Sequence, residues 1–391
     1  MSPARTMEAA ARQKIMNAAR TLEAMDKMHR LSRYTDCAAF AVCEWSSMVL
    51  PDASDSRLAD LTRWVFDDLG FAGGRIAPAS VDASFRRYFR VTRGEETFIV
   101  MDAPPEKESL GPFLSVAKIL LGMGLNAPVV LAKDPKRGLL LLSDLGTRQY
   151  LDELDTEEAA DRLYADALGA LCTMQIADRA VARDLPSYSH ALLMREMELM
   201  PEWFLRRHLG LQISAAERGM LDRLFETLAQ SALAQPATFV HRDYHSRNLL
   251  VTADLSPGIL DFQDAVWGPV TYDLASLLKD CYVAWPAPRV RAWALQYRER
   301  LLARGFPLGL TEAEFIRGFD LVGLQRHIKV LGIFSRLYYR DGKAQYLKDL
   351  PRVLRYTRDA AAAYAETAEF ADFVAKRVEP EFLAAQSRAL A

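Results

Sequence analysis

The spacing of apolar residues divides the chain into a β-rich first part and a helical second part. Four leucine or valine side chains recur at helical spacing over residues 57–69, which predicts a helix that ends at Gly70. Two runs rich in aromatic and β-branched residues, 85–92 and 97–101, flank a polar turn that contains a glycine. This arrangement predicts an antiparallel strand pair.

A second strand pair is predicted at 129–131 and 139–142, on either side of an Asp-Pro-Lys-Arg-Gly turn. Between the two pairs, an apolar run over 112–122 predicts a helix. One antiparallel sheet with a single helix therefore accounts for residues 71–143.

Helical periodicity dominates the rest of the chain. Residues 157–176 form the clearest case, with apolar side chains on one face and polar ones on the other. Further helical patterns cover 190–208, 215–234, 289–304, 312–340 and 351–375. Three short strand-like pieces interrupt them, at 237–241, 248–251 and 258–262.

These patterns predict an α+β fold with two lobes. The first is a small antiparallel β-sheet lobe over 51–145, and the second is a larger, mainly helical lobe over 146–391. Residues 1–50 are predicted to be an N-terminal extension, to which we assign neither a function nor a defined order.

Composition and charge narrow the classes of function. Half of the residues are hydrophobic and 26% are charged, as in an ordinary globular protein. The 49 basic and 51 acidic residues give a formal net charge of -2, so we expect neither nucleic acid nor a membrane as a partner. The four cysteines lack metal-ligand spacing, which predicts free thiols in a reducing compartment. With no signal-peptide pattern and no apolar stretch of roughly 18 residues, we expect a soluble cytoplasmic protein. We also expect it to be a monomer.

The polar residues that suggest chemistry gather in the β-island of the helical lobe. Asp243 and Asn248 lie five residues apart on a loop between strands, and Asp261 ends a later strand that returns close to them. Two carboxylates and an amide are hard oxygen donors, which suit Mg²⁺. Phosphoryl transfer uses such a set, because one carboxylate orients the acceptor hydroxyl while an Asn and a second Asp hold the metal.

The order His241-x-Asp243-x-x-x-x-Asn248, followed by Asp261, resembles the catalytic signature of the protein-kinase-like phosphotransferases, specifically the aminoglycoside phosphotransferase superfamily. The resemblance implies a protein-kinase-like two-lobe fold that uses ATP and Mg²⁺. It also implies that Asp243 is the catalytic base, that Asn248 and Asp261 bind Mg²⁺, and that Asn248 belongs to the nucleotide site. His241 would brace the loop.

The chain departs from the protein-kinase pattern in three places. Gln263 replaces the glycine of the Asp-Phe-Gly motif, Met101 stands where kinases place a phosphate-binding lysine, and the phosphate loop is poor in glycine. Cations that could replace the lysine are Arg87, Arg90 and Lys107. For the nucleotide the resemblance implies contacts from the phosphate loop and the inter-lobe hinge, namely Ser84, Arg87, Ser143, Asp144 and Leu145.

Longer segments look like the anomeric kinases of N-acetylmuramate and N-acetylglucosamine. The similar segments are 239–248, 261–280, 83–90, 101–107, 195–204, 324–329 and 340–343, and the resemblance covers about residues 55–360. Members of this family use ATP to phosphorylate the anomeric hydroxyl of the sugar, in a cell-wall (peptidoglycan) recycling route towards UDP-N-acetylmuramate. The resemblance therefore implies an amino-sugar substrate.

Sugar contacts are expected from acidic, amide, basic and aromatic side chains near the catalytic loop: Glu196, Glu198, Trp203, His245, Asp264, Gln325, Arg326 and His327. The alternative interpretation is that the two glutamates are solvated helix charges, the tryptophan belongs to the core and His327 lies at the surface. Asp273 is expected to brace the catalytic loop. Arg247 either faces the transferred phosphoryl group or is an ordinary surface arginine.

Two other functions stay open at this point. The same fold phosphorylates other small alcohols, so an aminoglycoside, choline or homoserine acceptor is the first alternative. A non-catalytic pseudokinase is the second, suggested by Met101 and the glycine-poor loop. The complete set of Asp243, Asn248 and Asp261 argues against it, because a scaffold that only binds needs no base and metal ligands.

Overall fold

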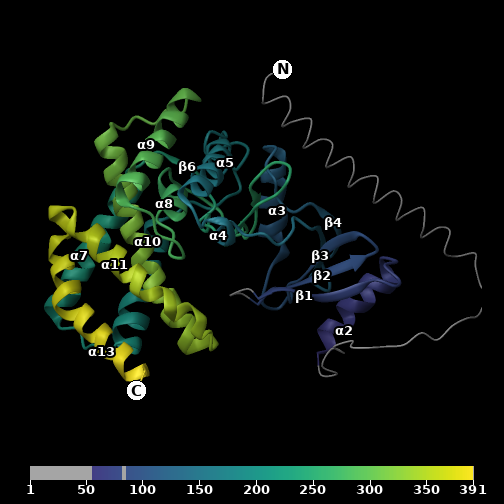
Figure 1. Ribbon diagram of the computed structural model, residues 1–391, viewed down its shortest axis with the longest axis horizontal. Helices are drawn as coiled ribbons and strands as arrows, with labels where there is room; N and C mark the ends of the chain where they lie inside the picture. The colour runs from purple at the N-terminus through teal and green to yellow at the C-terminus, as the bar shows by residue number, and fades with distance from the viewer. Residues whose placement is uncertain (1–54, 82–84, 391) are drawn as a thin grey trace, which may run out of the picture. The chain divides into compact units, whose positions relative to one another are not determined.

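The computed structural model of the protein describes residues 55–81 and 85–390 (Figure 1). The predicted extension over 1–50 and Ser84 of the predicted phosphate loop lie outside the described residues. The chain divides into two compact units after Gly146. Within the described part, no helix is both long and apolar enough to cross a membrane.

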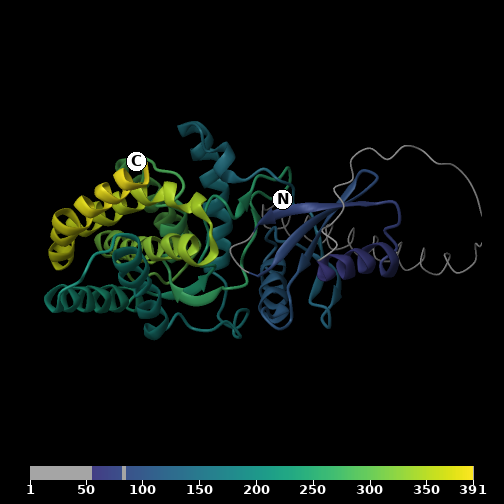
Figure 2. The ribbon, with the colours of Figure 1, turned by 90° about the horizontal axis from the view of Figure 1, so that it is seen from below.

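The first unit is built on a five-stranded antiparallel sheet with strand order β1-β2-β3-β5-β4. Its strands are drawn in blue in Figures 1 and 2. Its strands are β1 (Arg75–Val81), β2 (Arg87–Arg93), β3 (Glu96–Asp102), β4 (Val130–Asp134) and β5 (Leu139–Ser143). Its helices are α2 (Ser56–Arg63), which continues as the π-helical turn η2 (Trp64–Asp68), and α3 (Leu110–Gly122).

One face of this sheet is closed by α2 and η2. Leu61, Trp64 and Val65 of the helix pack against Phe89 and Val91 of β2 and other buried strand residues. Side chains alternate between the two faces along each strand, so every second residue of β2 and β3 lies under the helix. The face on which a side chain lies therefore follows from its position in the strand.

The second unit is mainly helical. It contains α4 (Tyr150–Glu153), α5 (Glu157–Gln175), α6 (His190–Met197), η3 (Met200–His208), α7 (Ala215–Leu233), α8 (Tyr272–Leu278), α9 (Ala287–Ala303), α10 (Glu312–Asp341), η4 (Ala344–Asp349), α11 (Leu350–Ala362), η5 (Ala365–Thr367), α12 (Ala368–Phe373), η6 (Val374–Val378) and α13 (Glu379–Leu390). The long helix α10 begins with a capping box formed by Thr311 and Glu314. It contacts η3, α7, α8 and α11, so it forms the centre of the unit.

Two short antiparallel ribbons lie within the helical unit. One pairs β6 (Ala237–Val240) with β9 (Val266–Pro269), and the other pairs β7 (Leu249–Leu250) with β8 (Gly258–Ile259). The loop from β6 to β7 carries residues 241–248, and residues 260–265 connect β8 to β9. Both segments that carry the sequence motif are therefore held at both ends by strands.

The predicted α+β fold, with a small antiparallel sheet and a helical majority, is confirmed. The sequence patterns missed β1, β9, α8 and α13. Strand β1 contains Pro78 and lies at the edge of the sheet, where a residue without an N–H group is tolerated. Strand β9 contains Gly268 and Pro269, which disguise its β pattern, and pairing with β6 defines it.

Candidate active site

The structure brings Asp243, Asn248 and Asp261 together. The side-chain amide of Asn248 donates to the main-chain oxygen of Asp243 at 2.9 Å and to Oδ2 of Asp261 at 3.3 Å. The Gln263 amide donates to Oδ1 of Asp261 at 2.6 Å. Since Nδ2 of Asn248 makes these bonds, its Oδ1 and the Asp261 carboxylate present oxygen donors at one place.

The oxygen atoms of Asn248 and Asp261 suit a magnesium ion whose other ligands are phosphate oxygens and water. Among the described residues no group of three or more His, Cys, Asp and Glu side chains is arranged to hold a metal ion. Mg²⁺ is usually bound through one or two carboxylates together with phosphate oxygens and water. Asn248 and Asp261 fit that kind of site.

Two carboxylates from the α8 region brace the catalytic loop. Asp273 is fully buried and accepts the main-chain N–H groups of His241, at 2.6 Å, and Arg242, at 3.0 Å. Burial raises the pKa of Asp273 to about 7, against the effect of these two hydrogen bonds and of Arg326. Asp280 accepts the Ser246 N–H at 2.9 Å and its hydroxyl at 2.5 Å. The brace predicted for Asp273 thus has a second member, Asp280, which sequence reasoning did not single out.

Arg242 is held in an unusual backbone conformation next to Asp243. Its φ of 77° lies in the left-handed region, which a residue with a Cβ rarely adopts and which recurs at functional sites. The Arg326 guanidinium donates to the Arg242 carbonyl at 2.6 Å, and the Arg242 guanidinium pairs with Glu196 and donates to the Asp264 carbonyl at 3.3 Å. Contacts from three separate elements therefore fix the residue that precedes Asp243.

Glu196 is the centre of a buried polar network. Its carboxylate accepts hydrogen bonds from the Tyr188 hydroxyl and, at 3.4 Å, from the Gln325 amide. It also forms ion pairs with Arg242 and, at 3.0 Å, with Lys329. Its exposed fraction is only 5%. Burial alone would raise the pKa of Glu196, but Lys329 and Arg242 outweigh it and hold the pKa at about 2.

Asp243 is half-buried and surrounded by positive charge. Burial acts to raise its pKa, but Lys329, Arg326, His245 and Arg242 lower it, and the net direction is downward. Asp243 is therefore a carboxylate at neutral pH. Its two oxygens can only accept hydrogen bonds in this state, which suits a group that orients a hydroxyl.

The predicted sugar contacts fall into two sets. His245 belongs to the catalytic loop itself. Glu196, Gln325 and Arg326 lie around the loop, and the exposed Asp264 joins them through its main-chain oxygen. Glu198 instead pairs with Arg218. Trp203 lies under the Arg207 guanidinium, whose central carbon is 4.1 Å from the ring centroid. His327 is buried rather than at the surface, stacked on Tyr356 with 4.9 Å between ring centroids. Each sugar contact itself stays a prediction.

Two buried histidines, His241 and His327, and the half-buried His245 make the stability of this unit dependent on pH. Burial lowers the pKa of His241 to about 4 and of His327 to about 3, and it also lowers the pKa of His245. The unfolded chain binds these protons more readily, so the stabilisation is complete above about pH 6.5 and is lost as the pH falls towards 4. The raised pKa of Asp273 acts in the opposite direction over the same range, but as one group against three. Urea unfolding between pH 7 and 4 should therefore give a falling free energy of unfolding.

The matched variant for this pH dependence is His327→Gln. It retains a donor for the Lys279 carbonyl, which His327 Nε2 contacts at 2.9 Å, but cannot titrate. We expect its pH slope to be shallower by up to about 1.4 kcal/mol per pH unit. An unchanged slope in the variant would exclude His327 from this effect.

Met101, at the position of the kinase lysine, is fully buried in β3. It pairs in register with Tyr88, whereas Arg87 pairs with Asp102. Because directly opposed residues share a face, Met101 and Arg87 lie on opposite faces of the sheet. Arg90, one of the three cations considered in place of the lysine, lies on the Met101 face.

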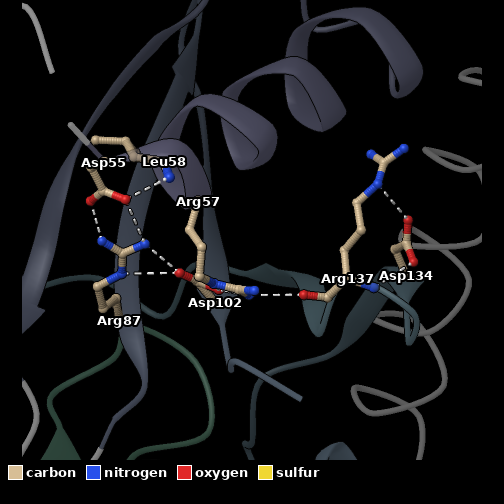
Figure 3. Close-up of polar contacts among 7 residues, drawn as sticks. All are labelled: Asp55, Arg57, Leu58, Arg87, Asp102, Asp134 and Arg137. Atoms are coloured by element: carbon tan, nitrogen blue, oxygen red, sulfur yellow. Dashed lines mark hydrogen bonds and ion pairs between the residues drawn. The ribbon is translucent and has the colours of Figure 1, made fainter. Parts of the chain in front are cut away.

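Arg87 belongs to a charged cluster beside α2 (Figure 3). Its guanidinium bonds to both Asp55 and Asp102, and Asp102, which is fully buried, also accepts a bond from Arg57 at 3.0 Å. Arg57 in turn donates to the Arg137 carbonyl at 2.8 Å. The paired charges compensate one another within the unit, as buried charges require. The nucleotide contact expected from Arg87 stays a prediction.

The segment after β5 is fixed by its own contacts. Arg90 forms a bidentate pair with Asp144, at 2.6 and 3.0 Å, and donates to the Gly146 carbonyl at 3.2 Å. The Ser143 hydroxyl accepts the Val129 N–H at 2.8 Å, and Leu145 is half-buried. Lys107 lies over the Phe85 ring, 4.5 Å from its centroid. The nucleotide contacts of residues 143–145 stay predictions.

Residues 75–311 match the sequence profile of the Phosphotransferase enzyme family. This range covers more than half of the chain and contains the whole motif from His241 to Asp261. The chain belongs to this phosphotransferase family. The predictions of a phosphotransferase and of its family are thereby confirmed.

Two bacterial proteins agree closely with this chain in sequence. A protein of Pseudomonas aeruginosa named N-acetylmuramate/N-acetylglucosamine kinase is 45% identical over 83% of this chain and 97% of its own length. A protein of Pseudomonas putida with the same name is 43% identical over 82% of this chain and 97% of its own length. The match therefore extends over nearly the whole of both relatives.

A solved structure of an aminoglycoside phosphotransferase with ADP bound has the same fold. It superposes with a TM-score of 0.52 over 77% of this chain and 98% of its own, at 16% sequence identity. The predicted protein-kinase-like fold is confirmed by this likeness. At such low identity the comparison informs only the fold of this phosphotransferase.

Proposed function

We propose that the protein is an ATP- and Mg²⁺-dependent kinase that phosphorylates the C1 hydroxyl of N-acetylmuramate and N-acetylglucosamine. The observation that carries the proposal is the meeting of Asp243, Asn248 and Asp261 in a chain that is 45% identical to a kinase named for these two sugars. The product would feed peptidoglycan recycling towards UDP-N-acetylmuramate. We expect the enzyme to act as a cytoplasmic monomer.

Asp243 would orient the acceptor. Its carboxylate would accept a hydrogen bond from the C1 hydroxyl. As the bond from this oxygen to the γ-phosphorus of ATP forms, the bond from that phosphorus to the departing ADP breaks, and the carboxylate takes the hydroxyl proton. Since the pKa of Asp243 is lowered by the surrounding cations, the carboxylate is a weak base. Its main contribution is then to hold the hydroxyl oxygen in line with the phosphoryl group, and proton transfer follows when the hydroxyl has become acidic.

Asn248 and Asp261 would hold Mg²⁺. When bound, the ion neutralises charge on the phosphate groups of ATP. The protein's own part is to fix these two side chains, through the Asn248 bond to the Asp243 main chain and the Gln263 bond to Asp261. The Asn248 amide also donates to Asp261 at 3.3 Å, which ties Asp261 to the loop that carries the base.

The reacting position can be tested with blocked sugars. Coupled ADP release in the presence of Mg²⁺ should be observed with N-acetylmuramate and N-acetylglucosamine, and should vanish for their 1-O-methyl glycosides, which lack the reacting hydroxyl. Phosphorus NMR of the product from N-acetylglucosamine should show the phosphate coupled to the anomeric proton. The 6-O-methyl sugar, which keeps the free anomeric centre, is the matched control and should retain turnover.

Three results would contradict the proposal. Absence of turnover with both N-acetylated sugars at millimolar concentration would reject the substrate assignment. Turnover of the 1-O-methyl glycoside would place the phosphate on another hydroxyl. Turnover of choline, homoserine or an aminoglycoside in preference to both sugars would replace the amino sugar with another acceptor.

A further inference from the structure

Arg247 is a catalytic-loop cation without an acidic partner. It lies between Asp243 and Asn248, and its side chain is half-buried. In residues 55–81 and 85–390, no carboxylate pairs with Arg247, and its side chain makes no hydrogen bond. The other cations near Asp243 are engaged, since Arg242 and Lys329 pair with Glu196 and Arg326 donates to the Arg242 carbonyl.

Aromatic rings hold the Arg247 guanidinium in place. Its central carbon lies 3.9 Å from the centroid of Tyr282 and 5.9 Å from that of Tyr346. Tyr282 and Tyr346 are in turn joined by Phe334, at 5.9 and 5.2 Å between ring centroids. A guanidinium that stacks through its face keeps its N–H edge available for a planar anion. The arginine is therefore positioned by the fold rather than extended into solvent.

This setting suits a sugar acid better than a phosphate alone. Sugars pack their C–H faces on aromatic rings, and Tyr282 and Tyr346 are both partly exposed. A carboxylate is planar and matches the guanidinium in a bidentate pair. Of the two proposed substrates, N-acetylmuramate carries a carboxylate, on the lactyl ether at C3, and N-acetylglucosamine carries a hydroxyl there.

We propose that Arg247 binds the lactyl carboxylate of N-acetylmuramate and so determines the preference between the two sugars. The inference rests on the proposed function and adds a specificity residue to it. Tyr282 and Tyr346 orient the guanidinium, while Asp243, from the same loop, receives the C1 hydroxyl. When N-acetylglucosamine binds, water contacts the Arg247 guanidinium in place of the carboxylate. The other contacts of the sugar are unchanged.

The test compares the two sugars in Arg247→Gln and Arg247→Lys. We expect Arg247→Gln to lower kcat/KM for N-acetylmuramate by about 10- to 100-fold, as for loss of a charged hydrogen bond, and to change that for N-acetylglucosamine by less than about twofold. Arg247→Lys should fall between, because lysine keeps the charge but not the bidentate geometry. Calorimetric binding of N-acetylmuramate without nucleotide should weaken by a similar factor.

Two controls complete the experiment. The methyl ester of N-acetylmuramate removes the charge from the substrate, so the wild type should lose its preference for the acid and Arg247→Gln should treat ester and acid alike. Arg317→Gln removes an arginine that also faces a tyrosine ring, 6.0 Å from Tyr364, but pairs with Glu366. It should leave the ratio of the two sugars unchanged.

The outcomes separate this proposal from the proposed function. Equal loss for both sugars in Arg247→Gln would show that the arginine serves the transferred phosphoryl group or the loop, and would overturn the inference. An unchanged ratio would overturn it as well. If the wild type turned over both sugars, the proposed kinase function would stand whatever the Arg247 variants showed. If the wild type turned over neither sugar, the kinase function and the role of Arg247 would both be rejected.

Discussion

Asp243→Asn should lower turnover by about 10²- to 10⁴-fold, the usual contribution of a positioned acid–base group. Asparagine keeps the shape of the side chain but replaces one acceptor oxygen with a donor, so the hydroxyl loses its orienting partner. Binding of ATP should persist, because Asn248 and Asp261 remain. Steady-state kinetics with N-acetylglucosamine, together with nucleotide titration by calorimetry, measures both quantities.

The matched control is Asp254→Asn, which makes the same charge change at an exposed position between β7 and β8. Its turnover should stay close to that of the wild type. A pH profile adds a second check. Since the pKa of Asp243 lies well below its usual range, protonation of this group should not reduce the wild-type rate between pH 8 and 6. An Asp243→Asn enzyme with near-wild-type turnover would exclude the carboxylate from the reaction.

Glu196→Ala should destabilise the protein by about 3–5 kcal/mol, the range for breaking a buried ion pair on one side. The substitution leaves Arg242 and Lys329 in a buried environment without their shared carboxylate. It also releases the arginine that precedes Asp243, so turnover should fall together with stability. Urea unfolding monitored by circular dichroism gives the free energy, and the sugar assay gives kcat and KM.

Two further variants distinguish this structural role from a sugar contact. Glu198→Ala removes a neighbouring carboxylate that pairs with Arg218 near the surface, and it should cost no more than about 1 kcal/mol. Adding Lys329→Met to Glu196→Ala removes one of the uncompensated cations and should restore part of the lost stability. If Glu196→Ala raised KM for the sugar at unchanged stability, Glu196 would be a substrate contact instead.

Local patterns predicted much of the fold and the central site. Helices over 57–69, 157–176 and 312–340 and the hairpin around 93–96 were predicted because each depends on neighbours within a few turns or on one tight turn. Strands β1 and β9 and the short helix α8 were missed, since Pro78, Pro269 and the brevity of α8 weaken the local signal. Pairing with β2, β6 and the catalytic loop defines these elements.

In the candidate site, too, residues close together in the sequence were predicted, and contacts between distant segments were not. The spacing from His241 to Asn248 and on to Asp261 indicated the reacting groups, because it resembles the catalytic signature of the protein-kinase-like phosphotransferases. The brace from Asp280 and the network around Glu196 were not predictable in this way. Gln325 lies 129 residues from Glu196 along the chain, and Asp280 lies 34 from Ser246.

By itself, the sequence determined the α+β class and the order of the two units, because these depend on short-range spacing. Its resemblance to a known catalytic signature indicated the catalytic loop. Only the tertiary structure decided which charges are available and which are already paired. It placed Arg87 and Met101 on opposite faces of one sheet and made Glu196 a buried ion-pair centre. It also left Arg247 stacked on Tyr282 without a carboxylate partner in the described chain. The reason is physical: the state of a charged side chain depends on burial and on partners that distant segments supply.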